Sequence, residues 1–457
     1  MSTATSSIAK LDIGARFRST RRRTLDLCAT LTPEDMMVQS CPESSPAKWH
    51  LAHTAWFFES FVLREKLPGY KLFNLDFPWL FNSYYRSFAE FPEKKLRASF
   101  SRPGMEEILS YREHVDEGIE RLLEGSPELE TLKTIELGVN HEEQHQELLL
   151  TDILHAFFTN PLRPIYMPEM KSQEVEDVRF LKADIRGSRR KSPNGFSTHP
   201  GEAPGTPGSG GANALRFLGF EGGLHEVGNS GEGFCFDNEL PRHRVWLEPY
   251  SLADRLVTCG EYADFMADGG YRKPELWLSA GWDAMQQNGW RAPLYWSSES
   301  GDWSLFTLRG ERCLAQMSAA PVSHLSYFEA DAYARWAGRR LATEFEWEAA
   351  AEAVSLEGNM LDSGRLMPSR AEETIQNGGA QFFGDCWEWT ASAYLGYPGF
   401  RALAGSLGEY NGKFMSGQMV LRGGSCVTPA PHIRASYRNF FAPETRWQFS
   451  GIRLASK

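Results

Sequence analysis

The stretch Asn140-His141-Glu142-Glu143-Gln144-His145-Gln146-Glu147-Leu148 lies in a long segment with the apolar spacing of an amphipathic helix. Residues four apart on a helix lie on one face, about 40° and one turn from each other, so His141 and His145 can reach a single metal ion. The same spacing also occurs on polar helix faces that bind nothing. From this pair alone, a metal site and a solvated or hydrogen-bonded pair are equally good interpretations.

A second histidine pair lies upstream, in Ser45-Pro46-Ala47-Lys48-Trp49-His50-Leu51-Ala52-His53-Thr54-Ala55-Trp56-Phe57-Phe58-Glu59. We expect Ser44 or Ser45 to cap a helix whose first residue is Pro46, with an apolar face of tryptophan, alanine and phenylalanine. His50 and His53 therefore belong to a buried helix. A single buried histidine usually hydrogen-bonds a carbonyl. Two helices that both direct histidine into a bundle core favour a metal site instead.

The apolar periodicity of the first half predicts a four-helix bundle. Its helices are expected at 15–31, 46–64, 105–123 and 130–158. The aromatic segment 68–103, which contains Pro78 and Pro92, interrupts this pattern and is too apolar to be a solvated linker. We expect this segment to pack over one end of the bundle.

The chain of 457 residues is too long for one ordinary hydrophobic core, so we expect more than one domain. We expect a helical bundle at 1–165, a linker at 166–214 and a second domain at 215–457. The linker contains the Gly-, Pro- and Ser-rich insert 201–211, which is expected to be disordered. The second domain has short β-like segments and many glycines, so we expect an α+β fold with longer helices only at 327–336 and 344–353.

Charge and cysteine content restrict the function. The 48 basic and 59 acidic residues give a net charge of -11, which offers no electrostatic support for nucleic-acid or anionic-membrane binding. Seven widely spaced cysteines without a Cys-x-x-Cys pair argue against a disulfide framework or a zinc ribbon. No apolar run reaches membrane-spanning length, and the first residues lack a signal-peptide core. We expect a cytoplasmic protein, and the sequence leaves a homo-oligomer open.

Six short motifs follow one another through the second half: 236–245, 321–326, 338–344, 384–390, 421–425 and 449–454. They resemble those of the formylglycine-generating-enzyme type of C-type-lectin-like fold, and the first half resembles a DinB-like four-helix bundle. Both parts together, in this order, are similar to the EgtB-like family, the sulfoxide synthases of ergothioneine biosynthesis. The resemblance covers nearly the whole chain and implies a multidomain α and α+β enzyme.

The resemblance also implies a metal site. In this family a Leu-Ala-His and a His-x-x-x-His hold non-haem Fe(II), which corresponds to His53, His141 and His145. His50 lies beside the motif as a supporting or packing residue. Three neutral imidazoles suit Fe(II) and leave coordination positions open. The family reaction joins the sulfur of a thiol to imidazole C2 of hercynine, with sulfoxidation, and O2 accepts four electrons.

Two tyrosines in the aromatic segment are the catalytic candidates. Phe81-Asn82-Ser83-Tyr84-Tyr85 matches a subgroup of the family that carries a tyrosine pair near the iron. A phenol can deliver a proton without bringing charge into a dry pocket. The alternative is a pair of half-buried aromatics whose hydroxyls reach the surface. The resemblance favours the catalytic role for Tyr84 and Tyr85.

Candidate substrate contacts follow from the same resemblance. They are Gln144, Lys94, Asn439, Phe440 and Phe441. Relatives that use γ-glutamylcysteine tend to carry an aspartate and then an arginine where this chain has Phe441 and Ala442. Relatives of the tyrosine-pair subgroup are often arginine-rich where this chain has Glu93-Lys94-Lys95, and a lysine holds a carboxylate less rigidly than a bidentate arginine does. The missing aspartate and arginine, together with the tyrosine pair, lead us to expect free cysteine as the sulfur donor, with hercynine and O2 as the other substrates.

Other activities remain as alternatives. Within the family these are the same chemistry with γ-glutamylcysteine, an ovothiol-type attack on C5 of histidine, and a selenium-transferring relative. The ovothiol-type enzymes normally append a methyltransferase domain, which we do not expect here. A formylglycine-generating enzyme would need two copper-binding cysteines, and Thr428 stands at the position of the first. A non-enzymatic alternative is a metal-free ligand-binding scaffold.

Overall fold

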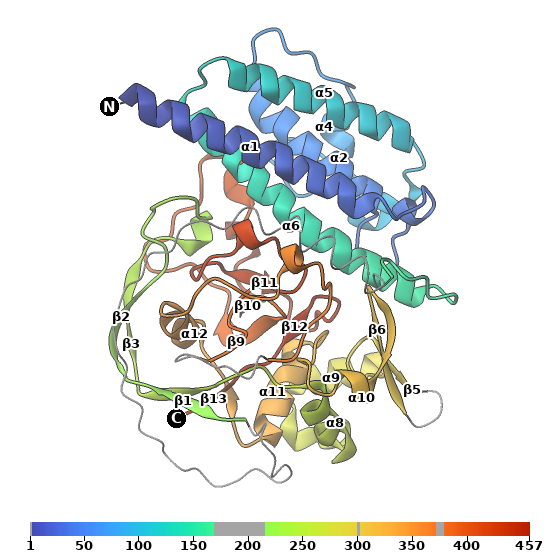
Figure 1. Cartoon of the computed structure of the whole chain (residues 1–457), viewed down its shortest axis with the longest axis vertical. Coiled ribbons are helices and arrows are strands. Elements are labelled where there is room, and N and C mark those ends of the chain that lie inside the picture. The colour runs from blue at the N-terminus through green and yellow to red at the C-terminus, as the bar shows by residue number, and fades with distance from the viewer. Residues whose placement is uncertain (1, 169–214, 299–301, 372–378) are drawn as a thin grey trace, which may run out of the picture.

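The computed structural model describes residues 2–168, 215–298, 302–371 and 379–457. A helical bundle precedes an α+β domain, as expected, and the bundle lies above that domain in Figure 1. The expected linker falls, from residue 169 onward, outside the described residues. Within the described part, no helix is both long and apolar enough to cross a membrane.

Four long helical segments build the bundle. They are α1 (Ser2–Cys28), α2 (Ala47–Phe58), α5 (Met105–Glu124) and α6 (Leu129–Thr159). A π-helical turn, Glu59–Leu63, and the short α3 (Arg64–Lys66) continue α2 in the same direction. All twelve residues of α2 are buried, because this helix packs against both α5 and α6. The four helices agree with those expected from the apolar periodicity, although α1 begins earlier.

The expected cap of α2 is wrong. Pro46 is the residue that precedes the helix, and no side chain caps it. The Ser44 hydroxyl donates to the Cys41 carbonyl, and the Ser45 hydroxyl accepts a hydrogen bond from Arg97. The main-chain N–H of Ser45 is held by Asp152 from α6, at 2.8 Å. A tertiary contact between helices therefore replaces the local cap.

The aromatic segment 68–103 packs onto the bundle, as predicted. It contains α4 (Phe77–Leu80) and a 3₁₀ turn at Lys94–Ser99. Phe77, Phe81 and Tyr85 are buried in the bundle core. The indole N–H of Trp56 donates to the Pro78 carbonyl at 2.9 Å, which joins the segment to α2. This packing brings the tyrosine pair to the same side of the bundle as the histidines of α2.

In the described part of the second domain, the strands form four small sheets. Their strands are β1 (Phe217–Phe220), β2 (Gly223–Val227), β3 (His243–Leu247), β4 (Tyr250–Ala253), β5 (Trp296–Ser298), β6 (Trp303–Thr307), β7 (Gly310–Cys313), β8 (Arg340–Leu341), β9 (Trp387–Ala393), β10 (Met419–Arg422), β11 (Asn439–Phe441), β12 (Ser450–Gly451) and β13 (Leu454–Ser456). The strand orders are β1-β4-β13-β8, β11-β10-β9-β12, β2-β3 and β5-β6-β7. Short strands and irregular connections give the α+β character that was expected.

Five helices accompany these sheets in the described residues. They are α8 (Cys259–Ala267), α9 (Ser279–Asn288), α10 (Leu314–Met317), α11 (Tyr327–Trp336) and α12 (Glu344–Ala351). The predictions at 327–336 and 344–353 are confirmed, but α8 and α9 were missed. A capping box of Thr258 and Glu261 begins α8, so its start signal was present in the sequence. Helix α9 has no side-chain cap and contains a glycine, Gly281.

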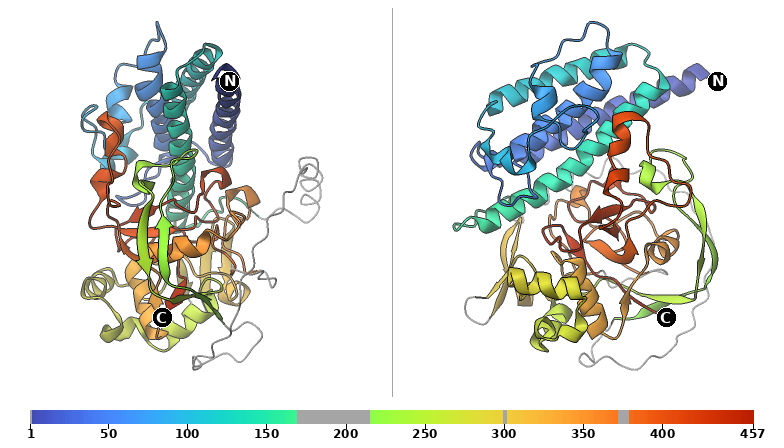
Figure 2. Two further views of the ribbon diagram at one scale, coloured as in Figure 1. Left: turned by 90° about the vertical axis from the view of Figure 1, so that its left-hand side faces the viewer. Right: turned by 180° about the vertical axis from the view of Figure 1, so that it is seen from behind.

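Helix α6 forms much of the boundary between the bundle and the second domain, as Figures 1 and 2 show. Gln144 donates to the Tyr437 hydroxyl at 2.5 Å, and Glu147 accepts hydrogen bonds from Thr428 and Trp387. Burial raises the pKa of the Glu147 carboxyl to about 7. The helix that carries His141 and His145 is therefore fixed to both parts of the chain.

Candidate metal centre

Three histidines from two helices converge inside the bundle. His53 comes from α2, and His141 and His145 come from successive turns of α6. One nitrogen of each lies within 4.8 Å of a nitrogen of the other two, and all three residues are buried. Their ring centroids are 4.5–5.0 Å apart. The structure thus brings together the three residues that the two histidine motifs predicted.

Three of the six ring nitrogens of this triad are buried and lack a hydrogen-bond partner among the described residues. His53 Nδ1 donates to the Phe81 carbonyl at 2.6 Å, which leaves the Nε2 lone pair unpaired. Neither ring nitrogen of His141 has a hydrogen-bond partner among the described residues. Leaving a buried polar atom unpaired costs about 1–3 kcal/mol, so a cluster of such atoms needs an explanation. A bound cation would satisfy them.

Burial keeps the three rings neutral. It lowers the pKa of His141 to about 3, and it places the pKa values of His53 and His145 well below the ordinary histidine value. The neighbouring imidazoles oppose protonation further, because a second positive charge there would be repelled. Neutral imidazole is the form that binds a metal ion. The donor set therefore fits Fe(II), and by its chemistry also Zn(II).

The tyrosine pair lies close to this triad but does not touch it directly. Tyr84 and Tyr85 stack at 4.7 Å, and the Tyr85 ring lies 5.5 Å from Trp56, which itself stacks on His53. The Tyr85 hydroxyl is buried without a hydrogen-bond partner among the described residues. Burial raises the pKa of both phenols above the ordinary tyrosine value. Both tyrosines therefore keep their protons at neutral pH.

Tyr410 is a residue of the site that sequence reasoning missed. It comes from the second domain, and its buried ring lies 5.7 Å from His141 and 6.3 Å from Tyr84. The segment around it docks on the tyrosine loop: Glu409 accepts from the main-chain N–H groups of residues 86 and 87, and Lys413 donates to the Tyr84 carbonyl. The second domain thus completes the wall of the metal site.

Arg97 is a second residue that was missed. Its guanidinium lies 3.4 Å over the Trp49 ring, and Trp49 stacks on His53 at 4.3 Å. It donates to the Ser45 and Ser83 hydroxyls, yet it has no ion pair with a carboxylate among the described residues. Burial lowers the pKa of this arginine to about 9. A buried cation whose hydrogen bonds go only to neutral groups can accept an anion, although the nearby Asp152 carboxylate offsets part of its charge.

The predicted substrate contacts lie at different places. Gln144 lies between the two ligand histidines on α6 and bonds Tyr437, whereas Lys94 is exposed on the turn that buries Arg97. The Phe440 ring stacks on Tyr394 at 4.0 Å and approaches Phe414, which contacts Tyr84. In the same strand, the Asn439 side chain accepts from the Phe440 N–H, and Phe441 packs near Trp447. Gln144 is therefore the nearest of them to the triad along the chain.

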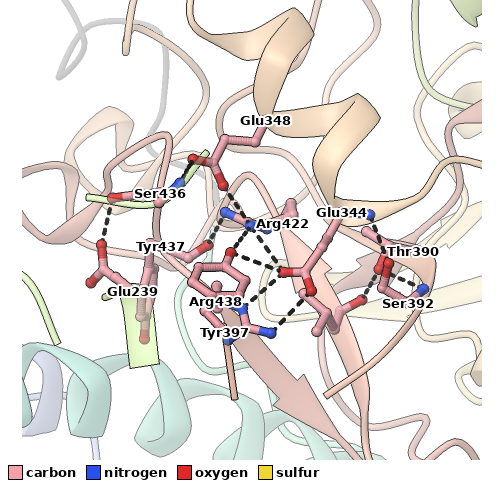
Figure 3. A network of polar contacts seen from close by, with 12 residues as sticks. Glu239, Glu344, Glu348, Thr390, Ser392, Tyr397, Arg422, Ser436, Tyr437 and Arg438 are labelled. Carbon is pink, nitrogen blue, oxygen red and sulfur yellow. Dashed lines mark hydrogen bonds and ion pairs between the residues drawn. The ribbon is translucent and has the colours of Figure 1, made fainter. Parts of the chain in front are cut away.

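A network of buried ion pairs fixes the segment just before β11, the strand that carries Asn439, Phe440 and Phe441 (Figure 3). Glu344 accepts from Arg438 at 2.8 Å and from Arg422 at 3.0 Å, and Arg422 also reaches Glu348. Arg422 further donates to the carbonyls of Ala435 and Tyr437. Helix α12, strand β10 and the segment before β11 are fixed together by these bonds. The network therefore positions Tyr437, the partner of Gln144.

Comparison with known proteins agrees with both parts of the fold. Residues 212–377 and 362–457 match the sulfatase-modifying factor enzyme 1-like domain, and residues 16–151 match the DinB superfamily. The chain therefore belongs to the sulfatase-modifying factor enzyme 1-like family. Because a DinB-type bundle precedes that domain, the resemblance drawn from the sequence motifs is confirmed, and the chain is an EgtB-like enzyme.

Relatives with the same arrangement are named hercynine oxygenases. The protein of Mycolicibacterium smegmatis is 27% identical, over 98% of this chain and 99% of its own length. That of Mycobacterium tuberculosis is 36% identical over 49% of this chain, and the match spans 56% of its length. A formylglycine-generating enzyme of Streptomyces coelicolor is 34% identical over only 28% of this chain and 45% of its own length.

Proposed function

We propose that this protein is a non-haem Fe(II), O2-dependent sulfoxide synthase that acts on hercynine and cysteine. The sulfur of cysteine would join imidazole C2 of hercynine, and hercynylcysteine sulfoxide and water would be formed. One C–H and one S–H bond are lost, and a C–S and an S–O bond are made, so one O2 accepts the four electrons. The observation that carries the proposal is the buried triad of His53, His141 and His145 with its unpaired nitrogens.

Iron is the metal that this reaction requires, because zinc has no redox chemistry with which to activate oxygen. When bound, Fe(II) would activate O2 and offer open coordination positions for O2 and substrates, while hercynine and cysteine would supply the four electrons. The protein contributes three neutral donors at fixed positions and a surrounding of aromatic rings that excludes water. Trp49, Trp56 and Phe57 lie against the triad histidines at centroid distances of 4.3–5.1 Å.

Proton delivery is the role that we assign to Tyr84 and Tyr85. Tyr85 is buried and Tyr84 half-buried, both hold their protons, and Tyr410 connects this pair to His141. A neutral donor suits a dry site, because no charge has to be carried into it. Lys413 lies 4.8 Å from the Tyr84 ring and bonds its carbonyl, so the second domain holds the loop in place.

Arg97 is the residue that best fits the carboxylate of the sulfur donor. It contacts Trp49 beside the triad and Ser83 beside the tyrosine pair, so an anion bound there would lie between the two. Its planar guanidinium can hold a carboxylate with two hydrogen bonds. Cysteine carries one carboxylate, whereas γ-glutamylcysteine carries two. The single buried guanidinium therefore supports cysteine as the donor.

The remaining predicted contacts complete the proposed pocket. Gln144 can hydrogen-bond the imidazole or the carboxylate of hercynine, and Asn439 and Lys94 can bind polar groups at its edge. The trimethylammonium group has no N–H to donate, so it requires aromatic faces. Phe440 and Phe441 lie on β11 as candidate walls. Phe441 would also close the space that a longer thiol needs.

A direct test is turnover. Metal-free protein is reconstituted with Fe(II) without oxygen and mixed with hercynine and cysteine, and air is admitted before mass spectrometry. The proposal expects a product with the mass of hercynylcysteine sulfoxide, and C2-deuterated hercynine should lose its deuterium. Parallel reactions with γ-glutamylcysteine, histidine and a selenium donor test the related activities. Absence of every coupled product, although Fe(II) is bound, would overturn the proposal.

A further inference from the structure

His50 connects one ligand histidine to a buried carboxylate. His50 Nδ1 lies 2.8 Å from His145 Nδ1, and His50 Nε2 lies 3.0 Å from Asp152 Oδ2. All three side chains are buried, with exposed fractions of 2%, 9% and 7% for His50, His145 and Asp152. His50 comes from α2, three residues before His53, and Asp152 lies two turns after His145 on α6. The chain Asp152–His50–His145 therefore crosses the helix interface.

The hydrogen bonds determine where the protons lie. An ionised carboxylate can only accept, so His50 Nε2 must carry the proton that is donated to Asp152. A neutral His50 then has a lone pair at Nδ1, and His145 Nδ1 must donate to it. This leaves His145 with an unprotonated Nε2, which is the form that binds a metal ion. The opposite arrangement would place a proton on the nitrogen that has to act as the ligand.

Asp152 is itself held in position. Its Oδ2 also accepts from the Ser45 main-chain N–H at 2.8 Å, immediately before α2 begins. One carboxylate oxygen therefore receives one N–H from the segment just before α2 and one from His50 within α2. Both His50 nitrogens are engaged, one by His145 and one by Asp152, so His50 is not available as a fourth ligand.

The three ligands are supported in different ways. His53 donates from Nδ1 to the Phe81 carbonyl, which orients its Nε2 in the same manner. His141 has no hydrogen bond to either nitrogen among the described residues and is held by packing against Phe57 and Tyr410. In metal sites, partners behind a ligand histidine fix its tautomer and commonly contribute tenfold or more to affinity. Of the three, His145 has the longest chain of hydrogen-bonded groups behind it, because its partner His50 is itself held by Asp152.

We infer that His50 and Asp152 are positioning residues that fix the tautomer and orientation of His145 for metal binding. This inference rests on the proposed function only in that a metal ion occupies the triad. His50 does not contact the ion, and its removal should leave the other two ligands in place. The expected effect is weaker binding, by about 10- to 100-fold, rather than loss of the site.

The test compares variants by Zn(II) affinity in chelator competition, which does not depend on oxygen chemistry. His50→Phe and Asp152→Ala should bind Zn(II) about 10- to 100-fold more weakly than wild type. His50→Asn should lose less, because its side-chain oxygen can still accept the His145 proton. His155→Phe is the matched control, since His155 lies on the same helix and bonds Ser40 instead. This control should bind as wild type does.

A second measurement uses the metal-free protein. Nitrogen-15 spectra of the histidine side chains should show His145 protonated at Nδ1 in wild type, and a shift of that proton or a mixture of tautomers in His50→Phe. Unchanged Zn(II) affinity in both His50→Phe and Asp152→Ala, with both folded, would overturn the inference alone. Failure of wild type to bind any divalent metal would instead overturn the proposed function, while the tautomer of His145 would still be measurable.

Discussion

Two polar clusters are buried equally deeply in this protein, but they differ in how their atoms are satisfied. In the second domain, Glu344, Glu348, Arg422 and Arg438 compensate one another's charges (Figure 3), and of their buried side-chain atoms only Arg422 Nε lacks a hydrogen-bond partner among the described residues. In the bundle, the histidine triad has three buried nitrogens without partners. The first cluster joins elements of the second domain, whereas the unpaired nitrogens of the triad support our proposal of a metal site.

The largest expected effect is the loss of activity when one histidine of the triad is replaced. His53→Ala, His141→Ala and His145→Ala should each reduce bound iron and product to background, because two imidazoles do not hold Fe(II) in place. Inductively coupled plasma mass spectrometry and product analysis measure this. His50→Ala should still bind iron at saturating concentration. Full iron occupancy in His53→Ala would refute the ligand assignment.

Substitutions in the ion-pair network of the second domain should lower the stability of the protein and leave metal binding unchanged. Glu344→Ala leaves the buried Arg438 without its carboxylate and Arg422 with Glu348 alone, which should lower the free energy of unfolding by about 3–5 kcal/mol. Thermal unfolding measures the shift. The control is Glu130→Ala, whose ion pair with Lys133 is exposed and should contribute less than about 1 kcal/mol. Equal effects of the two changes would show that the network is not structural.

A third prediction concerns the tyrosines beside the triad. Tyr84→Phe and Tyr85→Phe should keep iron and substrates bound but slow sulfoxide formation by about 100-fold, since only the proton-donating hydroxyl is removed. Stopped-flow kinetics and product analysis separate binding from chemistry, and diversion of cysteine to its sulfinic acid would agree with this role. Wild-type turnover in both variants and in the double variant would make the pair structural.

The smallest predicted effect is the choice of sulfur donor. A second carboxylate would enter a pocket in which we propose that the buried guanidinium of Arg97 binds the first, and an uncompensated buried polar group costs about 1–3 kcal/mol. Cysteine should therefore be preferred over γ-glutamylcysteine by at least about tenfold in kcat/KM, because about 1.4 kcal/mol corresponds to one decade. Competition at fixed hercynine measures this ratio. Equal or reversed preference would reveal an additional basic contact.

Helix periodicity, a local property, indicated the pair His141 and His145 and the buried helix of the second pair, and the family resemblance then selected His53 rather than His50 as the third ligand. Sequence reasoning missed Arg97 and selected Lys94, one 3₁₀ turn earlier, because only the folded turn decides which of the two points inward. Tyr410 was missed for a similar reason: its approach to His141 depends on docking between the two domains. Ser45 was interpreted as a cap, although the tertiary partners Arg97 and Asp152 bind it instead.

The measurement that tests the central claim most directly is an anaerobic Fe(II) titration of metal-free protein. Wild type and Glu344→Gln should each bind one Fe(II) per chain, because that network lies outside the metal site. His141→Ala should bind none at the same concentrations. Equal binding by wild type and His141→Ala, or no binding by wild type, would contradict the account that the unpaired triad is a metal site.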